Sequence, residues 1–387
     1  MTVKRMLDVS FSETMRISKI ASKMEAEGDN VISLAVGEPD FNTPDFINEA
    51  ACESMKNGNT HYTAPQGIPE LREEIAKISK EKNNLNFSKE NVIITPTKQA
   101  IFMAVLAHLD DGAEAIITDP TWVSYAPMIK FADGIPRRVP LHAEKDFSPD
   151  PDEIADTITS RTNMIILNTP SNPTGMTMKK EDLKGIAELA IDNDLIVISD
   201  EVYENLIFEG EHHSIGSFDG MEERTITVSG FSKSYAMTGW RLGYAVAPEE
   251  IIHEMELLLA DAISCTTSFA QKGGVEALRG PQDFTEMMME EFTKRRNALV
   301  EGINEKVPGM SCIYPKGAFY AFPNIKETGM TSEEVAKYML NDAGVALLPG
   351  TAFGSQGEGF LRISYAQSLD MIEKGIERMK TALKEKL

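Results

Sequence analysis

The chain has 387 residues, of which 42% are hydrophobic and 25% are charged, the composition of an ordinary globular protein with a large core. Its formal net charge of −22 at pH 7 argues against nucleic acid and anionic membrane surfaces as partners, because both would repel it. The N-terminus lacks the apolar run of a signal peptide, and no run approaches the length of a membrane span. Three widely spaced cysteines argue against a disulfide framework and a zinc site, so we expect a cytoplasmic protein.

Short apolar runs alternate with amphipathic stretches through the middle of the chain. The runs lack polar alternation, which predicts strands covered on both faces, as in a mostly parallel sheet. The whole pattern predicts an α/β fold with crossover helices. The expected strands are residues 92–95, 115–118, 164–167, 195–199 and 225–228. The expected helices are residues 98–109, 122–132, 181–193 and 249–261.

The C-terminal third has a different pattern, beginning with a long charged helix expected at residues 283–306. A strand pair at 317–322 and 360–364 brackets a helix at 332–342, and a final helix closes the chain. This pattern predicts a smaller α+β domain. The segment before residue 45 is too short to fold alone, so we expect it to pack onto that domain. The expected domains are a large one at 46–285 and a small one formed by 1–45 and 286–387.

Polar residues follow each of the expected buried strands. In open sheets of this kind, ligands bind at the carboxyl ends of the strands. We therefore expect these residues to share one ligand site. They are Thr97 and Lys98, Asp119 to Trp122, Asn172, Asp200, and Lys233.

Lys233 lies among small and aromatic residues between Ser229 and Tyr244, without acidic neighbours. Such a lysine is unusual on a surface and fits a buried amine, whose pKa burial would lower enough for it to form a Schiff base. Arg241 follows eight residues later and suits an anion held beside that amine.

Asp200 ends a buried strand, where a carboxylate needs a cationic partner such as a protonated ring nitrogen; a helix N-cap is an equal alternative. Tyr203 lies about one helical turn further on, so its hydroxyl can point into the same pocket. Asn172 opens Asn172-Pro173-Thr174-Gly175, which taken alone is only a turn. Trp122 either packs in the core or stacks on an aromatic ligand.

Two further positions suit anions. Thr97 and Lys98 open a helix, where free N–H groups and the positive end of the helix dipole can hold a phosphate. An ordinary first-turn lysine is disfavoured there, because a cation is electrostatically misplaced at that end. Arg362 lies in an apolar strand and must face either a bound carboxylate or an internal salt bridge. His212 and His213 are adjacent in an acidic loop and rarely chelate together in such a position, so no metal site is predicted.

Together these motifs resemble the pyridoxal-phosphate-dependent class I aminotransferases of fold type I, nearly end to end. The resemblance implies a large domain with a mostly parallel, seven-stranded sheet and a smaller α+β domain. The stretch Thr97-Lys98-Gln99-Ala100 looks like the bacterial and archaeal aspartate aminotransferase subgroup. The motifs that carry the resemblance are Val36-Gly37-Glu38-Pro39-Asp40-Phe41, His61-Tyr62-Thr63-Ala64-Pro65-Gln66-Gly67, Asn172-Pro173-Thr174-Gly175, Asp200-Glu201-Val202-Tyr203, Ser232-Lys233, Gly239-Trp240-Arg241 and Phe360-Leu361-Arg362-Ile363-Ser364-Tyr365.

For the cofactor, the resemblance implies that Lys233 holds pyridoxal phosphate as a Schiff base and then moves a proton between the substrate Cα and the cofactor C4′. Asp200 would pair with the ring nitrogen and keep it protonated. Tyr203 and Asn172 would hydrogen-bond the phenolic oxygen of the ring, and Trp122 would stack on the ring. The implied phosphate ligands are Arg241, Thr97, Lys98, and a hydroxyl from Ser229 or Ser232.

The resemblance also implies that Tyr62 reaches the phosphate of the neighbouring subunit, so the active unit is expected to be a homodimer. Two positions depart from the family pattern. Pro96 has no N–H to offer the phosphate, and Gly230 stands where some relatives have a phosphate-binding serine. Cis peptides are implied at Asp119-Pro120 and Asn172-Pro173.

For the substrate, the resemblance implies a clamp for the α-carboxylate and a second cation for a distal carboxylate. Lys98, with Thr14 nearby, is associated with the distal carboxylate of aspartate in that subgroup, so we expect transamination between aspartate and 2-oxoglutarate. Aromatic, prephenate or other substrates stay open, as does a fold type I lyase. A Rossmann dehydrogenase is disfavoured, because no Gly-x-Gly-x-x-Gly follows an early strand. The implied residues of the α-carboxylate site are Arg362, Gly37, Asn172 and Trp122.

Overall fold

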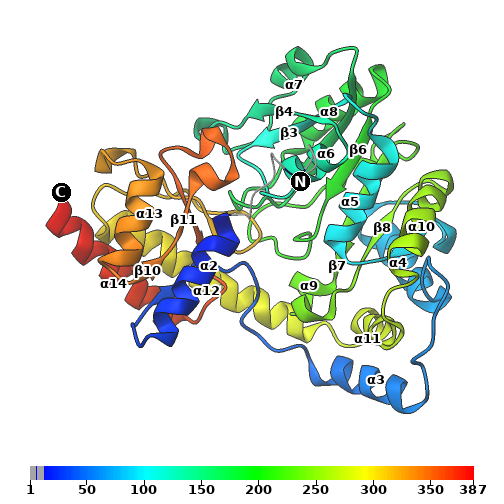
Figure 1. Ribbon diagram of the computed structural model, residues 1–387, viewed down its shortest axis with the longest axis horizontal. Helices are drawn as coiled ribbons and strands as arrows, with labels where there is room; N and C mark the ends of the chain where they lie inside the picture. The colour runs from blue at the N-terminus through cyan, green and yellow to red at the C-terminus, as the bar shows by residue number, and fades with distance from the viewer. Residues whose placement is uncertain (1–5, 7–12) are drawn as a thin grey trace.

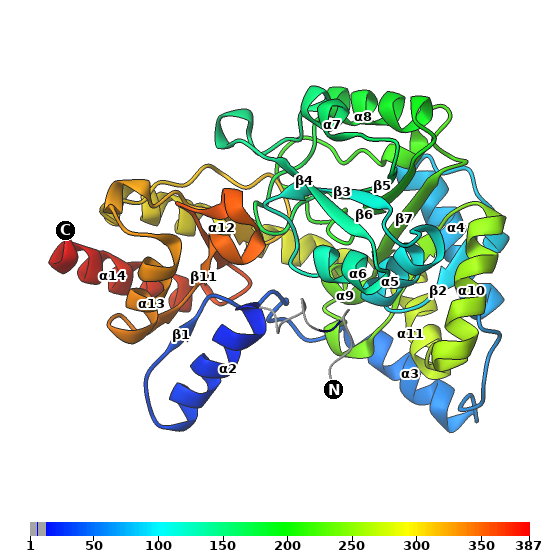
Figure 2. The same ribbon diagram turned by 45° about the horizontal axis from the view of Figure 1, so that its top comes forward.

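The computed structural model describes residue 6 and residues 13–387. It has two lobes, one built on a central sheet with helices on both faces and the other on a small sheet with the C-terminal helices (Figure 1, Figure 2). Among the described helices, none is long and apolar enough to cross a membrane.

The central sheet has seven strands. They are β2 (Val92–Ile94), β3 (Glu114–Asp119), β4 (Ile135–Pro140), β5 (Thr162–Asn168), β6 (Ile196–Asp200), β7 (Thr225–Gly230) and β8 (Gly243–Val246). Their order is β2-β8-β7-β6-β5-β3-β4, and only β8 runs antiparallel to its neighbours. The predicted α/β fold with a mostly parallel, seven-stranded sheet is therefore confirmed, and all five predicted buried strands are present.

Successive side chains of the buried strands pack on opposite faces of the sheet, which explains why these strands read as continuous apolar runs. In β3, for example, Ile116 packs in one hydrophobic cluster and Ile117 in another. On the Ile117 face lie α5 (Thr97–His108), α6 (Tyr125–Phe131) and α10 (Glu249–Ile263). On the Ile116 face lie α7 (Pro151–Thr157) and α8 (Lys180–Asp192).

A third cluster covers the β2–β8 end of the sheet, where α4 (Pro69–Asn83) and α11 (Ser268–Arg279) pack with α3 (Asp45–Lys56). The four helices predicted in this lobe are present. α6 begins at Tyr125 rather than at residue 122, because residues 123 and 124 form a turn before it. A short helix, α9 (Phe231–Ser234), follows β7 directly.

The smaller lobe contains α12 (Asp283–Lys306), α13 (Ser332–Asn341) and α14 (Leu369–Lys386). Its sheet is formed by β11 (Leu348–Pro349), β12 (Leu361–Ser364) and β9 (Tyr320–Ala321), all antiparallel, so the predicted strand pair is confirmed. The N-terminal α2 (Glu13–Ala26) and β1 (Ile32–Ser33) lie beside this lobe (Figure 2). β1 pairs with β10 (Val345–Ala346). The domain boundary expected at residue 285 falls inside α12 and stays a prediction.

The topology brings several strand ends to one edge of the sheet. β2 and β7 are both antiparallel to β8, so β2 shares the direction of β5, β6 and β7. The carboxyl ends of these four strands therefore lie at the same edge. β12 of the smaller lobe faces that edge, and a cavity opens between them.

Candidate active site

A cavity of about 620 Å³ lies at this edge. It brings together twelve of the predicted site residues, which come from α2, the segment before α3, the carboxyl ends of five strands, the turn before β8, and β12. Three predicted residues do not line the cavity of their own chain: Tyr62, which is 87% exposed, and Ser229 and Asp119. The predicted residues that line it are Thr14, Gly37, Thr97, Lys98, Trp122, Asn172, Asp200, Tyr203, Ser232, Lys233, Arg241 and Arg362.

Lys233 projects into the cavity from α9, directly after β7. Its Nζ donates a hydrogen bond to the carbonyl oxygen of Gly37 at 2.6 Å. Burial is the main reason that the pKa of Lys233 falls from 10.5 to about 8. The charge of Glu38 opposes this fall, and the charges of Arg362 and Arg241 contribute to it. The neutral, nucleophilic form of the amine is therefore far more populated at pH 7 than in a solvated lysine.

Asp200 ends β6 and is 4% exposed. Its carboxylate accepts hydrogen bonds from the Tyr125 hydroxyl at 2.7 Å and from the backbone N–H of Val202 at 3.3 Å. Burial raises the pKa of Asp200 to about 6, although the Tyr125 hydrogen bond opposes the rise. No Lys or Arg of residues 13–387 forms an ion pair with it, and the chain continues into a turn rather than a helix. The N-cap alternative is thus wrong, and the site suits a cationic ligand.

Tyr125 is a residue of the site that the sequence motifs did not indicate. It is fully buried at the start of α6, and its ring packs edge-on against Trp122 at 5.2 Å between centroids. Its hydroxyl lies behind Asp200, outside the cavity lining. Its position three residues after Trp122 could have indicated it from the sequence, because two side chains spaced in this way can face the same strand end.

Arg362 lies on β12 and is 3% exposed. One terminal nitrogen donates to the side-chain oxygen of Asn172 at 3.2 Å, and the other donates to the carbonyl oxygen of Ala35. Its Nε has no partner, and no carboxylate among residues 13–387 pairs with it. The internal salt bridge considered from sequence is therefore absent from the described chain. A buried guanidinium with a spare donor fits a bound carboxylate.

Lys98 and Arg241 form the cationic end of the cavity. The Nζ of Lys98 lies 4.8 Å from the centre of the Trp122 ring, and burial followed by the charge of Arg241 lowers the pKa of Lys98. Arg241 adopts a left-handed conformation and donates to the carbonyl oxygen of Thr238 at 2.7 Å. Within residues 13–387, neither cation has a carboxylate partner, so both remain available to an anion.

The two predicted serines face different surroundings. Ser232 lines the cavity, whereas the Ser229 hydroxyl donates to Oε1 of Glu204 at 2.6 Å and is not part of the lining. At the neighbouring Gly230, an added Cβ would lie 2.5 Å from Oγ1 of Thr97. Glycine at 230 therefore allows the start of α5 to approach β7, which gives this departure from the family pattern a structural reason.

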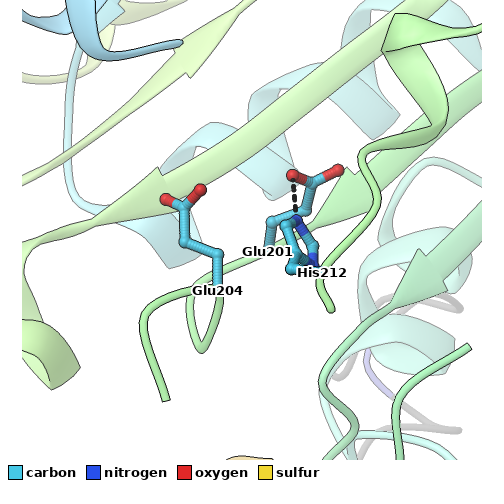
Figure 3. Close-up of side chains that lie close together, drawn as sticks. All are labelled: Glu201, Glu204 and His212. Carbon is cyan, nitrogen blue, oxygen red and sulfur yellow. Dashed lines mark hydrogen bonds and ion pairs between the residues drawn. The ribbon is translucent and has the colours of Figure 1, made fainter. Parts of the chain in front are cut away.

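His212 belongs to a buried polar network behind the strand ends, together with Glu201 and Glu204 (Figure 3). Its Nε2 lies 2.8 Å from Oε2 of Glu201, and Oε1 of Glu201 accepts from two serine hydroxyls. Glu204 accepts from Asn83 and Ser229. Protein donors thus serve both carboxylates, whereas the Nδ1 of His212 is buried without a hydrogen-bond partner among the described residues.

Both implied cis peptides, at Asp119-Pro120 and Asn172-Pro173, are present, and Thr169-Pro170 is a third that was not predicted. Asp119 itself is turned away from the cavity. Its carboxylate accepts hydrogen bonds from Ser355 and from the backbone of Gln356, at 3.1 Å each. It therefore joins the two lobes rather than binding a ligand with the other strand ends.

Comparison with known proteins agrees with this geometry. The chain matches the family model of aminotransferase class I and II over residues 29–379. It is 45% identical over 383 residues to an aspartate aminotransferase of Pyrococcus abyssi, covering 98% of this chain and 97% of that protein. It is 42% identical to aromatic-amino-acid aminotransferase 2 of Thermococcus litoralis, with coverage of 98% and 97%. The structure matches an aspartate aminotransferase from Thermus thermophilus with maleate at a TM-score of 0.95 and 38% identity, covering 99% of each chain.

The fold and the site thus define an enzyme that transfers amino groups. The chain belongs to the class I and II aminotransferases, and the resemblance stated from its motifs is confirmed.

Proposed function

We propose that the enzyme transfers the amino group of aspartate to 2-oxoglutarate, with pyridoxal phosphate as its cofactor. The observation that carries the substrate assignment is a pair of cations, Arg362 and Lys98, which line one cavity without a carboxylate partner in residues 13–387. A dicarboxylic acid offers one carboxylate to each cation. Two relatives, at 45% and 44% identity, carry the name aspartate aminotransferase.

The residues of the cavity fit pyridoxal phosphate. Asp200 is a buried carboxylate served by neutral donors, which suits a protonated ring nitrogen. Arg241, with Thr97 and Ser232 beside it in the lining, offers a cation and hydroxyls to a phosphate. Lys233 supplies an amine whose lowered pKa favours a Schiff base.

When bound, the cofactor supplies an electron-withdrawing ring that stabilises negative charge at the substrate Cα. Lys233 would hold the cofactor and would remove and return the proton at that carbon. Asp200 would keep a proton on the ring nitrogen, while Trp122 would cover one face of the ring. Tyr203 and Asn172 would donate hydrogen bonds to the phenolic oxygen of the ring.

Arg362 would bind the α-carboxylate of either substrate. Its guanidinium is held on two sides, by Asn172 and by the carbonyl oxygen of Ala35, so its free edge has a fixed direction. The backbone of Gly37 lies nearby, since its carbonyl oxygen accepts from Lys233. The clamp would therefore place Cα close to the amine that moves its proton.

Lys98→Ala is expected to lower kcat/KM for aspartate about 100-fold and to leave kcat/KM for alanine within about threefold. The lost contact is an ion pair with the distal carboxylate, in a partly buried place where such contacts are worth a few kcal/mol. Coupled assays with both donors and 2-oxoglutarate would measure the two values.

Lys98→Arg is the matched control, because it retains the charge and should keep more of the aspartate activity than the alanine variant. Equal losses for aspartate and alanine in Lys98→Ala would contradict the aspartate assignment. A panel that includes phenylalanine, tyrosine and prephenate would show whether an aromatic or prephenate activity exceeds that for aspartate, which would replace the proposal.

We propose further that the active unit is a cytoplasmic homodimer. Tyr62, which the family motif assigns to the phosphate of a second subunit, is exposed and lies outside the cavity of its own chain. Light scattering is expected to give about twice the chain mass of 42.7 kDa.

Within each subunit, we propose that residues 46–285 form the cofactor-binding domain and that 1–45 with 286–387 form the small domain.

A further inference from the structure

We propose that Tyr320 is a positioning residue for both the substrate clamp and the cofactor site. Its ring orients Arg362, and its hydroxyl orients Tyr203. This inference rests on the proposed function of the cavity. Tyr320 is 1% exposed and belongs to the cavity lining, yet no sequence motif singled it out.

The placement of Tyr320 follows from the small sheet. Tyr320 begins β9 and lies opposite Ser364 of β12. Arg362 is two residues before Ser364, so its side chain is on the same face of the sheet as the Tyr320 ring. The guanidinium of Arg362 lies 4.5 Å from the centre of that ring.

The ring supports Arg362 without using any of its hydrogen-bond donors. A planar guanidinium over an aromatic face gains a cation–π attraction and is prevented from tilting. Phe353 lies 5.0 Å from the same guanidinium and adds a second aromatic contact. The guanidinium thus keeps its direction, and its unpartnered Nε stays free for a carboxylate.

The hydroxyl of Tyr320 lies 3.0 Å from the hydroxyl of Tyr203, and the two rings meet nearly perpendicularly at 82°. Burial, followed by the proximity of Tyr320, holds the pKa of Tyr203 well above its usual value, and burial raises the pKa of Tyr320. Both hydroxyls are therefore protonated at neutral pH. One proton makes the bond between them, and the other remains available to a ligand, because no further group of residues 13–387 hydrogen-bonds to either oxygen.

Tyr320 also touches the segment that accepts from Lys233. A Cβ added at Gly37 would collide with the Tyr320 hydroxyl, so the backbone at Gly37 approaches this side chain as closely as it can. One buried side chain therefore contacts the carboxylate clamp, the phenol expected at the cofactor and the loop beside the reactive lysine.

Two variants separate the roles of the ring and the hydroxyl. Tyr320→Phe keeps the ring, so we expect KM for aspartate and the dissociation constant of maleate to stay within about twofold. It removes the hydroxyl, so we expect kcat to fall about tenfold and the pH midpoint of the visible absorbance of the bound cofactor to rise by about one unit. Tyr320→Leu removes both, so we expect about a tenfold weaker maleate affinity in addition.

Tyr365→Phe is the matched control. Tyr365 is fully buried in the same lobe and donates to the carbonyl oxygen of Ala318 at 3.4 Å, but it does not line the cavity. We expect it to leave kcat, maleate affinity and the absorbance midpoint unchanged.

Any one of three results would overturn the inference. Tyr320→Phe could match the wild type in kcat and in the absorbance midpoint, or Tyr320→Leu could bind maleate as tightly as Tyr320→Phe does. Tyr365→Phe could also reproduce the effects of Tyr320→Phe. A wild-type protein whose cofactor absorbance ignores every amino acid would instead overturn the proposed function and this inference with it. The first three results are obtained with an active wild-type enzyme. A failure of this inference can therefore be distinguished from a failure of the proposed function.

Discussion

Replacing Lys233 by alanine is expected to reduce the transamination rate about 10⁴-fold or more, while the protein still folds. The variant lacks both the amine that would hold the cofactor and the group that would move the proton at the substrate Cα. Folding should not suffer, because burial already disfavours the charged form of this lysine, whose pKa it lowers to about 8. Stopped assays with aspartate and 2-oxoglutarate would measure the rate, and thermal unfolding would measure stability.

Lys184→Ala is the control for this result. Lys184 is an exposed residue of α8 whose ion pair with Glu188 spans 3.9 Å, so its removal should change neither rate nor stability. A Lys233→Ala variant with more than about a hundredth of the wild-type rate would remove this lysine from the catalytic role.

Asp200→Asn is expected to act in opposite directions on activity and on stability. Activity should fall at least about 100-fold, because a neutral amide cannot keep a proton on the ring nitrogen of the cofactor. The cofactor-free protein should become more stable at pH 7, by about 2 kcal/mol. This figure combines about 3 kcal/mol for the burial of a carboxylate with a pKa of about 6, and about 1 kcal/mol for the weakened bond to Tyr125.

The pH dependence of this stability difference has a defined sign. Because folding raises the pKa of Asp200 from 3.8 to about 6, the folded state binds its proton more tightly than the unfolded state does. The favourable contribution is therefore present below about pH 4 and is lost as the pH rises through about 6. Urea unfolding of the cofactor-free proteins should show the stability gain of Asp200→Asn at pH 7 and a much smaller gain at about pH 4.

Asp194→Asn provides the comparison, since Asp194 is 97% exposed and should give no such pH-dependent gain. An Asp200→Asn protein that is less stable than the wild type at pH 7 would show that an unrecognised cation already pairs with this carboxylate. Retained activity of Asp200→Asn would show that the ring nitrogen of the cofactor does not need this carboxylate.

The buried strands of the sheet could be predicted from the sequence, because a strand covered on both faces must be apolar throughout. Strand β4 could not be predicted, because it contains Arg137, Arg138 and two prolines. This strand pairs only with β3 at the edge of the sheet, where solvent tolerates charge and a proline costs no ladder hydrogen bond on the open side. β8 was also not predicted, because its first two residues, Gly243 and Tyr244, lie within the stretch that was interpreted as a site motif.

The site could be predicted where a residue type is rarely explained by anything but chemistry, as with Lys233, Asp200 and Arg362. Tyr125 and Tyr320 could not be found in that way. A buried tyrosine is usually a core residue, and only the folded structure places these two hydroxyls against Asp200 and Tyr203.

The direction in which a side chain points could likewise not be predicted from the sequence. Ser229 and Ser232 are equivalent as residue types, yet the last residues of β7 and the turn into α9 point them to opposite sides. Ser229 donates to Glu204, and only Ser232 reaches the cavity. Asp119 likewise ends a strand at the expected edge but is used to hold residues 355 and 356 of the smaller lobe.

The two half-reactions test the central claim most directly. Purified protein loaded with pyridoxal phosphate would be titrated with aspartate and then with 2-oxoglutarate while its visible absorbance is recorded. We predict that the absorbance band shifts on addition of aspartate and returns on addition of 2-oxoglutarate, in proportion to the amount of enzyme. A band that does not move with aspartate or with any other amino acid would contradict the account.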